Sequence, residues 1–321
     1  MLQRECTYEA LLKPQVVDRF LCCRCGTCAA VCPKIGSPKP DYHAFVPDIG
    51  KEGVEKCRRC YDSCPMAHQP VASGGGPVID AFSAIASNPS TRERGQDGGA
   101  CTAFLESLEG YESCTIRSHD GTPVPTIGDD PQKSSGSKYA STSSLSLFPR
   151  RMEKIAFVGL PCQVLGIHKA QSLGLLKEIS LKIALFCTNT YDHNLFWETA
   201  GENGVSRDDV MKVEIRKDMF FICRGGEVKK MKKSLFSSAA IPGCASCTDF
   251  TGVHSDISFG SEGSAKKCST VLVRTQKGKR LMDQAIEKNY IVPEGDVDTD
   301  AVISRFEKKW ERNRHGQAHI H

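Results

Sequence analysis

The sequence predicts a mixed α/β core that follows a small cysteine-rich N-terminal head, and three observations carry this prediction. Seven regularly spaced cysteines lie within residues 20–66. A Gly/Pro-rich stretch, PVASGGGPVI (70–79), follows them as the best linker candidate. Beyond residue 150, short apolar runs typical of buried strands alternate with stretches of helical periodicity. We therefore expect a head over residues 1–70 and a core over residues 71–321, in line with the roughly two domains expected for 321 residues.

The overall composition excludes several classes of protein. The 42 Lys and Arg against 38 Asp and Glu leave a net charge of +4, too balanced to indicate nucleic-acid binding. No apolar run is long enough to span a bilayer, and the start MLQRECTYEALLKPQ lacks the apolar core of a signal peptide. We therefore expect a cytoplasmic protein without direct membrane insertion, peripheral to a membrane complex only through a partner. The 17 cysteines, an odd number in a long chain, favour metal binding over a disulfide scaffold.

The elements of the core follow from its apolar patterns. Residues 119–146, rich in Gly, Pro, Ser and Asp, predict a long surface loop. KIAFVGL (154–160) and LKIALF (181–186) have the apolar character of buried strands, and residues 162–173 between them have helical spacing. The remaining expected elements are a helix over 194–201, alternating strands over 210–217, 219–223 and 226–232, strands over 255–260 and 269–275, and helices over 277–288 and 298–313.

The first group of cysteines has the spacing of a bacterial ferredoxin. The run Cys22-x2-Cys25-x2-Cys28-x3-Cys32-Pro33 fits that motif in full, and in two-cluster ferredoxins its fourth cysteine ligates the other cluster. A second run, with cysteines at 57, 60 and 64 and a proline at 65, repeats the last three positions and has Val54 at the first. The spacing predicts one [4Fe–4S] cluster held by Cys22, Cys25, Cys28 and Cys64.

A second head cluster would take the remaining cysteines of both runs, Cys32, Cys57 and Cys60. Its fourth ligand is not identified, and the candidates are Cys6, Cys23 or an oxygen atom. Zinc is the alternative metal because C-x2-C pairs also build zinc ribbons, although zinc sites rarely have the full run followed by proline. We expect one or two clusters in the head, and an oxygen-sensitive head indicates an anaerobic host.

Four further cysteines lie within the core. Cys162 directly follows a predicted strand in GLPCQ, and Cys187 follows another in LFCTN, while Cys244 and Cys247 form a C-x2-C pair in GCASCTD. If the two strands are parallel neighbours, their carboxyl ends bring Cys162 and Cys187 together. A helix N-terminus beyond each of these two cysteines would favour an anionic thiolate site. The alternative is that Cys162 and Cys187 are inert buried cysteines.

Six pieces of the core, in order, carry a resemblance to a known family. They are GQDGGACTAFLESL (95–108), GSKY (136–139), KIAFVGLPCQVLGIHKAQ (154–171), LFC (185–187), GCASCTDF (243–250), and SDISFGSEGS with STVLVRTQKG (255–278). Over this stretch the chain resembles the beta subunit family of coenzyme F420-reducing hydrogenase and F420 dehydrogenases. With its ferredoxin-type head it is similar to the electron-input subunit of F420H2 dehydrogenases. The resemblance implies one FAD, hydride exchange with the deazaflavin coenzyme F420, and a [4Fe–4S] cluster held by Cys162, Cys187, Cys244 and Cys247.

The FAD site is expected at glycine-rich loops, because no G-x-G-x-x-G follows a predicted strand. Glycines let the backbone approach a phosphate or a ring, and nearby amides and hydroxyls can then bond it. Lys138 could pair with the pyrophosphate or the electron-rich edge of the flavin. Without the family resemblance, ordinary turns would explain these loops. The expected flavin-binding residues are Gln96, Asp97, Gly98, Gly99, Thr102, Ser137, Lys138, Tyr139, Ser261, Gly263, Ser264, Ser269 and Thr270.

Together these features predict an iron–sulfur flavoprotein oxidoreductase. A deazaflavin gives two electrons as a hydride and a cluster accepts one, so a flavin, which does both, belongs between them. We expect electrons to pass between coenzyme F420, FAD, the core cluster, the head and a protein partner of dehydrogenase, hydrogenase or heterodisulfide-reductase type. No side chain need act as a strong acid or base, so no catalytic residue is named, and the direction of flow is left open.

Three other functions remain open at this point. One is a flavoprotein that takes electrons from ferredoxin to reduce an organic substrate, one is a flavin-free electron relay, and one is a zinc-stabilised scaffold. The Lys-rich stretch RGGEVKKMKK (224–233) could attract the acidic tail of the deazaflavin coenzyme, but a strand edge protected against aggregation is the favoured explanation.

Overall fold

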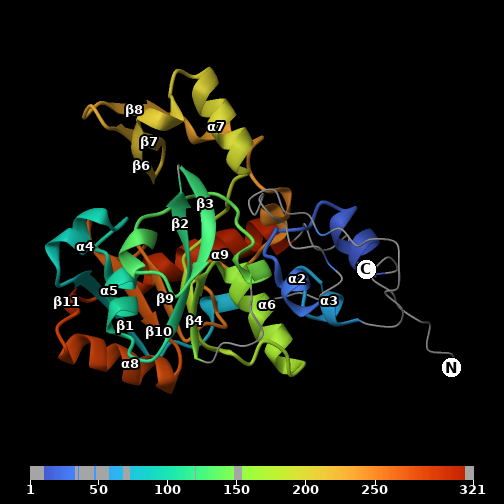
Figure 1. The fold of residues 1–321 in the computed structure, drawn as a ribbon, viewed down its shortest axis with the longest axis horizontal. Coiled ribbons are helices and arrows are strands. Elements are labelled where there is room, and N and C mark those ends of the chain that lie inside the picture. Colours follow the sequence, from blue (N-terminus) through green and yellow to red (C-terminus); the bar gives the residue numbers. More distant parts are fainter. Residues whose placement is uncertain are drawn as a thin grey trace.

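The computed structural model describes residues 11–32, 35, 47, 58–67, 73–119, 121–147 and 154–314 (Figure 1). Cys6 and Cys57, both considered above as cluster ligands, lie outside the described residues. No helix in these ranges combines the length and apolar character needed to cross a membrane.

An eight-stranded mixed sheet forms the centre of the molecule. Its middle strands β2, β4, β5 and β9 run parallel, and both flanks are antiparallel. Every residue of β4, IAFVG, is buried, which is typical of a parallel strand covered on both faces. In spatial order the strands are β11 (Ile291–Gly295), β1 (Asp80–Ala86), β10 (Ser269–Val273), β9 (Ile257–Gly260), β5 (Ile179–Leu185), β4 (Ile155–Gly159), β2 (Glu112–His119) and β3 (Thr122–Ile127).

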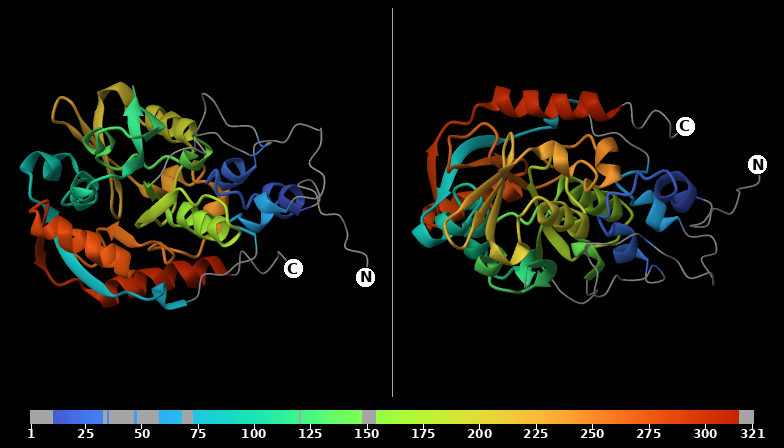
Figure 2. Two further views of the ribbon diagram at one scale, coloured as in Figure 1. Left: turned by 60° about the horizontal axis from the view of Figure 1, so that its bottom comes forward. Right: turned by 90° about the horizontal axis from the view of Figure 1, so that it is seen from above.

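Side chains alternate between the two faces of the sheet and build two separate cores. Ile155 and Phe157 of β4 pack on the side of α6 (Pro161–Ser172) and the head. Ala156 and Val158 pack on the opposite side, against α5 (Ala100–Ser107) and α8 (Gln276–Glu287). The sheet is therefore a layer between the head with α6 and the pair α5 and α8, while α4 (Pro89–Arg94) lies beside β1 and α5 (Figure 2).

The described part of the head packs directly on α6. Its elements are the short helices η1 (Lys13–Val17), α2 (Thr27–Val31) and α3 (Arg59–Asp62). A Cβ added to Gly166 of α6 would lie 2.1 Å from Oγ1 of Thr27, so the close approach of α2 requires glycine there. Head and sheet share one buried core, and the predicted division at residue 70 stays a prediction.

A small module stands at the edge of the molecule, above β2 and β3 in the view of Figure 1. It combines α7 (His193–Glu202) with the antiparallel strands β6 (Val210–Ile215), β7 (Met219–Cys223) and β8 (Val228–Met231). Phe196 contacts the rings of Phe221 and Phe236 in its separate aromatic core.

The predicted strands and helices from residue 154 onwards are confirmed, ending with α9 (Thr299–Arg314). The surface loop expected over 119–146 is wrong: it holds β3 and the short helices η3 (Pro131–Ser134) and η4 (Ser144–Leu147), and Leu145 is fully buried. Both prolines of β3 lie on an edge strand of the sheet, where a missing N–H is tolerated.

The described part of the expected linker is tied to the core. The guanidinium of Arg274 donates to the carbonyl oxygens of Gly75 and Pro77 at 2.9 and 3.0 Å. The backbone N–H of Gly74 donates to a carboxylate oxygen of Glu307 on α9 at 2.6 Å. This stretch therefore holds α9 against the rest of the molecule.

Candidate functional site

The first two core cysteines converge because of the sheet topology. β4 and β5 are parallel neighbours, with Gly159 opposite Ala184, and the chain leaves both at the same edge. Cys162 is the second residue of α6, and Cys187 lies two residues beyond β5. The predicted approach is confirmed, because the Cys162 thiol is among the neighbours that, after burial, raise the pKa of Cys187. The helix expected beyond Cys187, over 194–201, is confirmed as α7, which begins at His193, six residues after the cysteine.

Cys244 and Cys247 complete this group, here called the core centre (Cys162, Cys187, Cys244 and Cys247). They lie on the short helix η7 (Pro242–Ser246) and directly after it, and Cys247 N–H donates to the Cys244 carbonyl at 3.3 Å. Burial, with smaller effects from Cys247 and Cys162, raises the pKa of Cys244 to about 12. A Cβ on Gly243 would lie 2.3 Å from the Leu21 carbonyl oxygen, so the head backbone passes directly against this turn.

Two buried polar residues of α9 back the core centre. Lys309, 4% exposed, donates from Nζ to the carbonyl oxygens of Cys187 and Asp249 at 2.7 Å each and lies 3.7 Å from Cys247 Sγ. Asn313, one turn further, donates to the carbonyls of Cys244 at 3.0 Å and Cys247 at 2.7 Å. Burial lowers the pKa of Lys309, but the neighbouring thiols outweigh it and raise that pKa overall. Sequence reasoning missed both residues.

Asp249 closes the loop that follows Cys247. Its carboxylate accepts backbone hydrogen bonds from Thr251 at 3.1 Å, Gly252 at 2.8 Å and Val253 at 3.0 Å. Burial raises the pKa of this carboxyl group, and the amides partly offset the rise. The carboxylate is therefore occupied by its own loop, and it is the main-chain oxygen of Asp249 that meets Lys309.

A small pocket opens beside the core centre. It is lined by Cys162 and Cys247 together with Pro65 and Met66 of the head. Thr248 also lines it, is 1% exposed, and has no hydrogen-bond partner for its hydroxyl oxygen among the described residues. A buried hydroxyl without a hydrogen-bond partner is unfavourable. This pocket is therefore suited to a group that can accept a hydrogen bond from the Thr248 hydroxyl.

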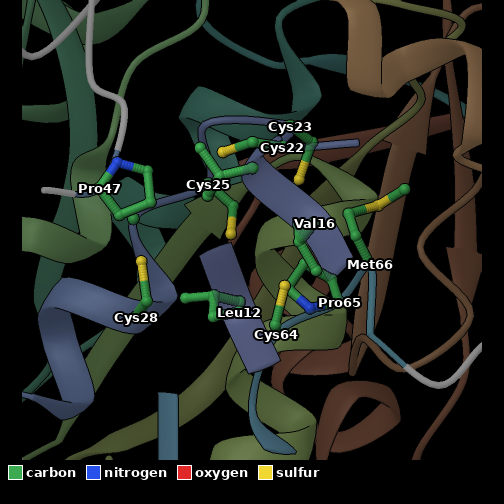
Figure 3. A pocket seen from close by; sticks show the side chains of 12 residues that line it. Leu12, Val16, Cys22, Cys23, Cys25, Cys28, Pro47, Cys64, Pro65 and Met66 are labelled. Atoms are coloured by element: carbon green, nitrogen blue, oxygen red, sulfur yellow. The ribbon is translucent and has the colours of Figure 1, made fainter. Parts of the chain in front are cut away.

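The head cysteines surround a second, apolar pocket (Figure 3). Leu12 and Val16 of the N-terminal segment cover it and are 1% and 2% exposed. Gly26 has φ of +83° and begins the turn into α2 between two of the cysteines. Five cysteines line this pocket, namely Cys22, Cys23, Cys25, Cys28 and Cys64. The name head centre is used here for the four that the spacing predicts as ligands, Cys22, Cys25, Cys28 and Cys64, and their ligand role stays a prediction.

Cys23 lies between the two centres. Its thiol is hydrogen-bonded to those of Cys162 and Cys25, and the bond from Cys23 lowers the pKa of Cys25 to about 7. Cys60, in contrast, is an electrostatic neighbour of Cys28. The structure thus places Cys23 toward the core, and Cys60 by Cys28. Whether Cys32, Cys57 and Cys60 hold a second head cluster stays a prediction.

The same short segment of the head borders both centres. Pro65 and Met66, directly after Cys64, line the head pocket and the pocket of the core centre. Lys169 of α6 fixes this segment by donating to the carbonyl oxygen of Cys64 and, at 2.5 Å, to that of Ala67. The two cysteine groups are therefore neighbours across one turn of backbone.

The loops expected to hold the flavin are brought together at the N-terminus of α5. Ser269 Oγ donates to the Asp97 carbonyl and accepts from Ala100 N–H at 3.4 Å. Ser261 is hydrogen-bonded to the Asp97 carboxylate, whose pKa burial raises. Further bonds within and between these loops join Ser264 to Thr270 at 2.7 Å, Thr270 to the Glu262 carbonyl at 2.6 Å, and Thr102 to Ser135 at 3.4 Å.

Lys138 is used within its own loop. Its Nζ donates to the carbonyl oxygens of Ser134, Ser135 and Gly136 at 2.7, 2.8 and 2.8 Å. Burial lowers the pKa of this lysine to about 8. All three ammonium protons have acceptors here, so Lys138 is positioned to shape the loop, and its expected pairing with a pyrophosphate stays a prediction.

Strand β6 of the small module joins these loops, which sequence reasoning missed. Lys212 donates to the Gly95 carbonyl at 3.1 Å, and Ile215 N–H donates to the Tyr139 hydroxyl at 3.4 Å. Arg216 and Glu214 are close enough to act on the Asp97 carboxylate. The alternating pattern of 210–217 predicts the strand but carries no sign of which loops it meets.

The Lys-rich stretch lies away from these contacts. Its strand β8 is an edge of the three-stranded sheet. Lys230 pairs with Asp218 at 3.0 Å, and Lys229 donates to the Gly204 carbonyl at 2.7 Å. Both contacts fit the favoured explanation of a protected strand edge.

The spacing of the thiols bears on the choice of metal. In the described part of the chain, no three His, Cys, Asp or Glu side chains converge closely enough to hold a single ion. Zn–S bonds of about 2.3 Å draw the sulfurs of a tetrahedral zinc site to within about 4 Å of one another. A [4Fe–4S] cluster binds each cysteine through a different iron, so its ligands stand farther apart. The choice between a cluster and zinc therefore stays a prediction.

Comparison with known proteins identifies the family. The sequence profile for the carboxyl-terminal part of the coenzyme F420 hydrogenase/dehydrogenase beta subunit matches residues 152–297. The beta subunit of a coenzyme F420 hydrogenase from Methanococcus voltae is 30% identical over 227 residues, covering 64% of this chain and 81% of that protein. This chain belongs to the coenzyme F420 hydrogenase/dehydrogenase beta subunit family. It is an oxidoreductase of this family, as the resemblance of its sequence predicts.

Two further relatives extend the match. The F420H2 dehydrogenase of Methanosarcina mazei has a subunit, designated F, that is 25% identical over 325 residues, covering 93% of this chain and 92% of that protein, so the similarity reaches into the head. A chain of the F420-reducing [NiFe] hydrogenase complex from Methanosarcina barkeri has the same fold, with a TM-score of 0.70 and 22% identity over 77% of this chain and 94% of that chain. The predicted mixed α/β core is therefore a fold that this chain shares with a chain of that complex.

Proposed function

We propose that this chain exchanges a hydride between coenzyme F420 and FAD, and that it passes single electrons through [4Fe–4S] clusters in the core and head centres to or from a partner protein. The observation that carries the proposal is the adjacency of the two cysteine groups. Pro65 and Met66 border both, and Cys23 contacts a thiol of each. A structural metal site needs no second site beside it, whereas electron transfer does.

The core centre suits a cluster by its donor set and its surroundings. Its four buried thiols supply the ligands that iron–sulfur clusters use in proteins. The Thr248 hydroxyl, Lys309 ammonium and backbone amides around the site are donors suited to cluster sulfurs. In the head centre, Cys22, Cys25, Cys28 and Cys64 would ligate a cluster in an apolar pocket.

The loops around Asp97 suit a flavin. The Gln96 Oε1 atom is buried and has no hydrogen-bond partner among the described residues, which leaves one acceptor open at the centre of the expected site. Gly98 and Gly99 have positive φ, a conformation that favours glycine, and they form the turn directly ahead of α5. Bound there, FAD would supply the conversion between two-electron hydride transfer and one-electron steps. The residues proposed to bind FAD are those of the three loops predicted above, with Lys212 and Tyr139 fixing the position of β6 beside them.

The substrate and the partner follow from the relatives. The M. voltae and M. mazei proteins are named for coenzyme F420 and F420H2, and the M. barkeri chain belongs to a hydrogenase complex. We propose coenzyme F420 as the hydride carrier of this chain and an electron-transfer protein as its partner at the head.

An anaerobic titration tests the proposal. The purified protein, reconstituted with iron and sulfide and supplemented with FAD, is titrated with reduced coenzyme F420 while its visible spectrum is recorded. We expect the oxidised deazaflavin band to appear as flavin and iron–sulfur absorbance bleach. If dithionite bleaches both centres and reduced coenzyme F420 bleaches neither, the hydride donor is another compound, and reduced ferredoxin is the next donor to test.

A further inference from the structure

We propose that helix α9 holds the charged side chain of Lys309 beside the core centre, an arrangement called the charge clamp below. In it, Lys309 is a positioning residue that raises the reduction potential of the cluster. The inference rests on the proposed function only in that the core centre binds a [4Fe–4S] cluster. Helix α9 lies beyond residues 152–297, the part of the chain that the family profile matches. The role of Lys309 is therefore argued from its own contacts.

The hydrogen bonds of Lys309 require the charged ammonium form. Its Nζ faces three acceptors, namely the carbonyl oxygens of Cys187 and Asp249 and the sulfur of Cys247. An ammonium group has three donors and no acceptor, so it satisfies this arrangement completely. A neutral amine would turn a lone pair toward one of the three acceptors.

The groups that favour the charged form of Lys309 are chiefly the thiols of the core centre, and Asp249 contributes less. A lysine that is 4% exposed is costly to bury without an opposite charge. Among the described residues, no Asp or Glu carboxylate makes an ion pair with it, and the nearest acidic residue, Asp249, points its carboxylate at backbone amides. As thiolate ligands of a bound cluster, Cys247 and Cys187 would be the anionic groups beside it. Lys309 thus places a positive charge directly beside the cysteines of the core centre.

Helix α9 is held firmly enough to keep this charge in place. Phe306, one turn before Lys309, is fully buried. Glu307 anchors the helix to Gly74, and Asn313 donates to both carbonyls of the Cys244–Cys247 turn. Through Lys309 and Asn313, the helix therefore holds the main-chain carbonyls of three of the four cysteines, those of Cys187, Cys244 and Cys247.

The effect on redox chemistry follows from charge alone. An electron that enters a cluster bound in the core centre would add one negative charge there, and its departure would remove that charge. The nearby ammonium favours the more negative, reduced state, so it raises the reduction potential of the core centre. No bond is made or broken, and Lys309 keeps its proton throughout.

The test is a redox titration, followed by electron paramagnetic resonance, of the reconstituted holoprotein and its Lys309→Met variant. Met is an unbranched side chain only one atom shorter than Lys, and it removes the charge. We expect the ratio of reduced to oxidised core cluster at a fixed potential to fall at least tenfold, which is a shift of about 59 mV for one electron. The matched control is Lys308→Met, because Lys308 is the exposed neighbour on the same helix and its loss should leave the potential unchanged.

The outcomes separate the inference from the function on which it rests. An unchanged potential in Lys309→Met at full iron content would overturn the clamp. If Lys309→Met loses core iron, Lys309→Arg decides: recovery of the iron supports a role for the charge, and loss in both variants overturns it. Wild-type protein without core iron would instead defeat the proposed function, and it is recognised by iron analysis before any variant is made.

Discussion

The head centre and the core centre use the same ligand, cysteine, but the chain builds them in different ways. Cys22, Cys25 and Cys28 of the head lie on one turn that leads into α2, inside an apolar pocket. The core cysteines come from two strand ends and a distant short helix, and α9 backs them with polar contacts. The difference teaches that sequence spacing suffices to predict the cysteines of the head centre. The cysteines of the core centre, in contrast, come together only once the sheet has formed.

The largest effect is expected from removing one ligand of the core centre. Cys162→Ser should cost about four iron atoms per chain, the content of one [4Fe–4S] cluster, and leave the head iron in place. Iron and sulfide analysis with electron paramagnetic resonance measures this. Cys223→Ser is the control, since Cys223 is buried in β7 of the small module and should lose no iron. Full iron in Cys162→Ser would contradict the ligand assignment.

Two adjacent cysteines sharpen the definition of the head centre. Both Cys22 and Cys23 line the head pocket, but only Cys22 is in step with the ferredoxin run, so Cys22→Ser should lose the head cluster. Cys23→Ser should retain it, because the Cys23 thiol is bonded to Cys25 and Cys162 rather than serving as a ligand. The head iron content of the two variants, measured side by side, checks this. The reverse result would shift the ligand run by one residue.

The packing of head against core predicts a smaller, structural effect. In Gly166→Ala the new Cβ would lie 2.1 Å from Thr27 Oγ1, which is too close for the present packing. The substitution should therefore destabilise the protein by about 1–3 kcal/mol. Gly201→Ala in α7 meets nothing within 4 Å and should stabilise by up to about 1 kcal/mol. Urea unfolding followed by circular dichroism measures both. Equal stabilities would mean that the head does not pack on α6.

The smallest effect concerns the ion pair that joins the head to the small module. Arg24 Nη1 lies 2.5 Å from Asp192 Oδ2, and both side chains are largely buried. Asp192 also caps α7 by accepting from Asn194 N–H at 3.0 Å, a role that asparagine can fill. Asp192→Asn should therefore cost about 1 kcal/mol through the lost ion pair alone.

The pH dependence of this pair has a definite sign. Burial raises the pKa of Asp192, but the hydrogen bond and charge of Arg24, together with the backbone amides of Leu195 and Asn194, outweigh it and hold that pKa below its ordinary value of 3.8. A carboxyl group with a lowered folded pKa stabilises the protein fully above its unfolded pKa and ceases to do so as the pH falls through the folded value. The difference in urea midpoint between wild type and Asp192→Asn should stay constant from about pH 7 to about pH 5 and shrink below about 3.8. A difference that grows on acidification would contradict the pairing.

The comparison also explains what the sequence could and could not predict. Each of the two cysteine runs is local, and their spacing indicates Cys22, Cys25 and Cys28 from the first run and Cys64 from the second. The strands of the core were predicted because β4 and β5 are continuous apolar runs, and parallel pairing then brings Cys162 and Cys187 together.

Hydrogen bonds between residues that are distant along the chain could not be predicted from the sequence. Lys309 and Asn313 look like ordinary solvent-facing residues of a charged helix, because their carbonyl partners lie far away along the chain. Lys212 of β6 is missed for the same reason. The loop predicted over 119–146 failed differently, since its prolines suggested a break where an edge strand accommodates them.

One measurement tests the central claim, that electrons pass from coenzyme F420 through the core centre to the head. Wild-type and Cys162→Ser proteins, both reconstituted and loaded with FAD, are mixed anaerobically with reduced coenzyme F420 and followed by absorbance and rapid-freeze electron paramagnetic resonance. We predict that flavin bleaches in both, while the head cluster is reduced promptly only in the wild type. Equally fast reduction of the head in Cys162→Ser, or no bleaching in the wild type, would contradict the account.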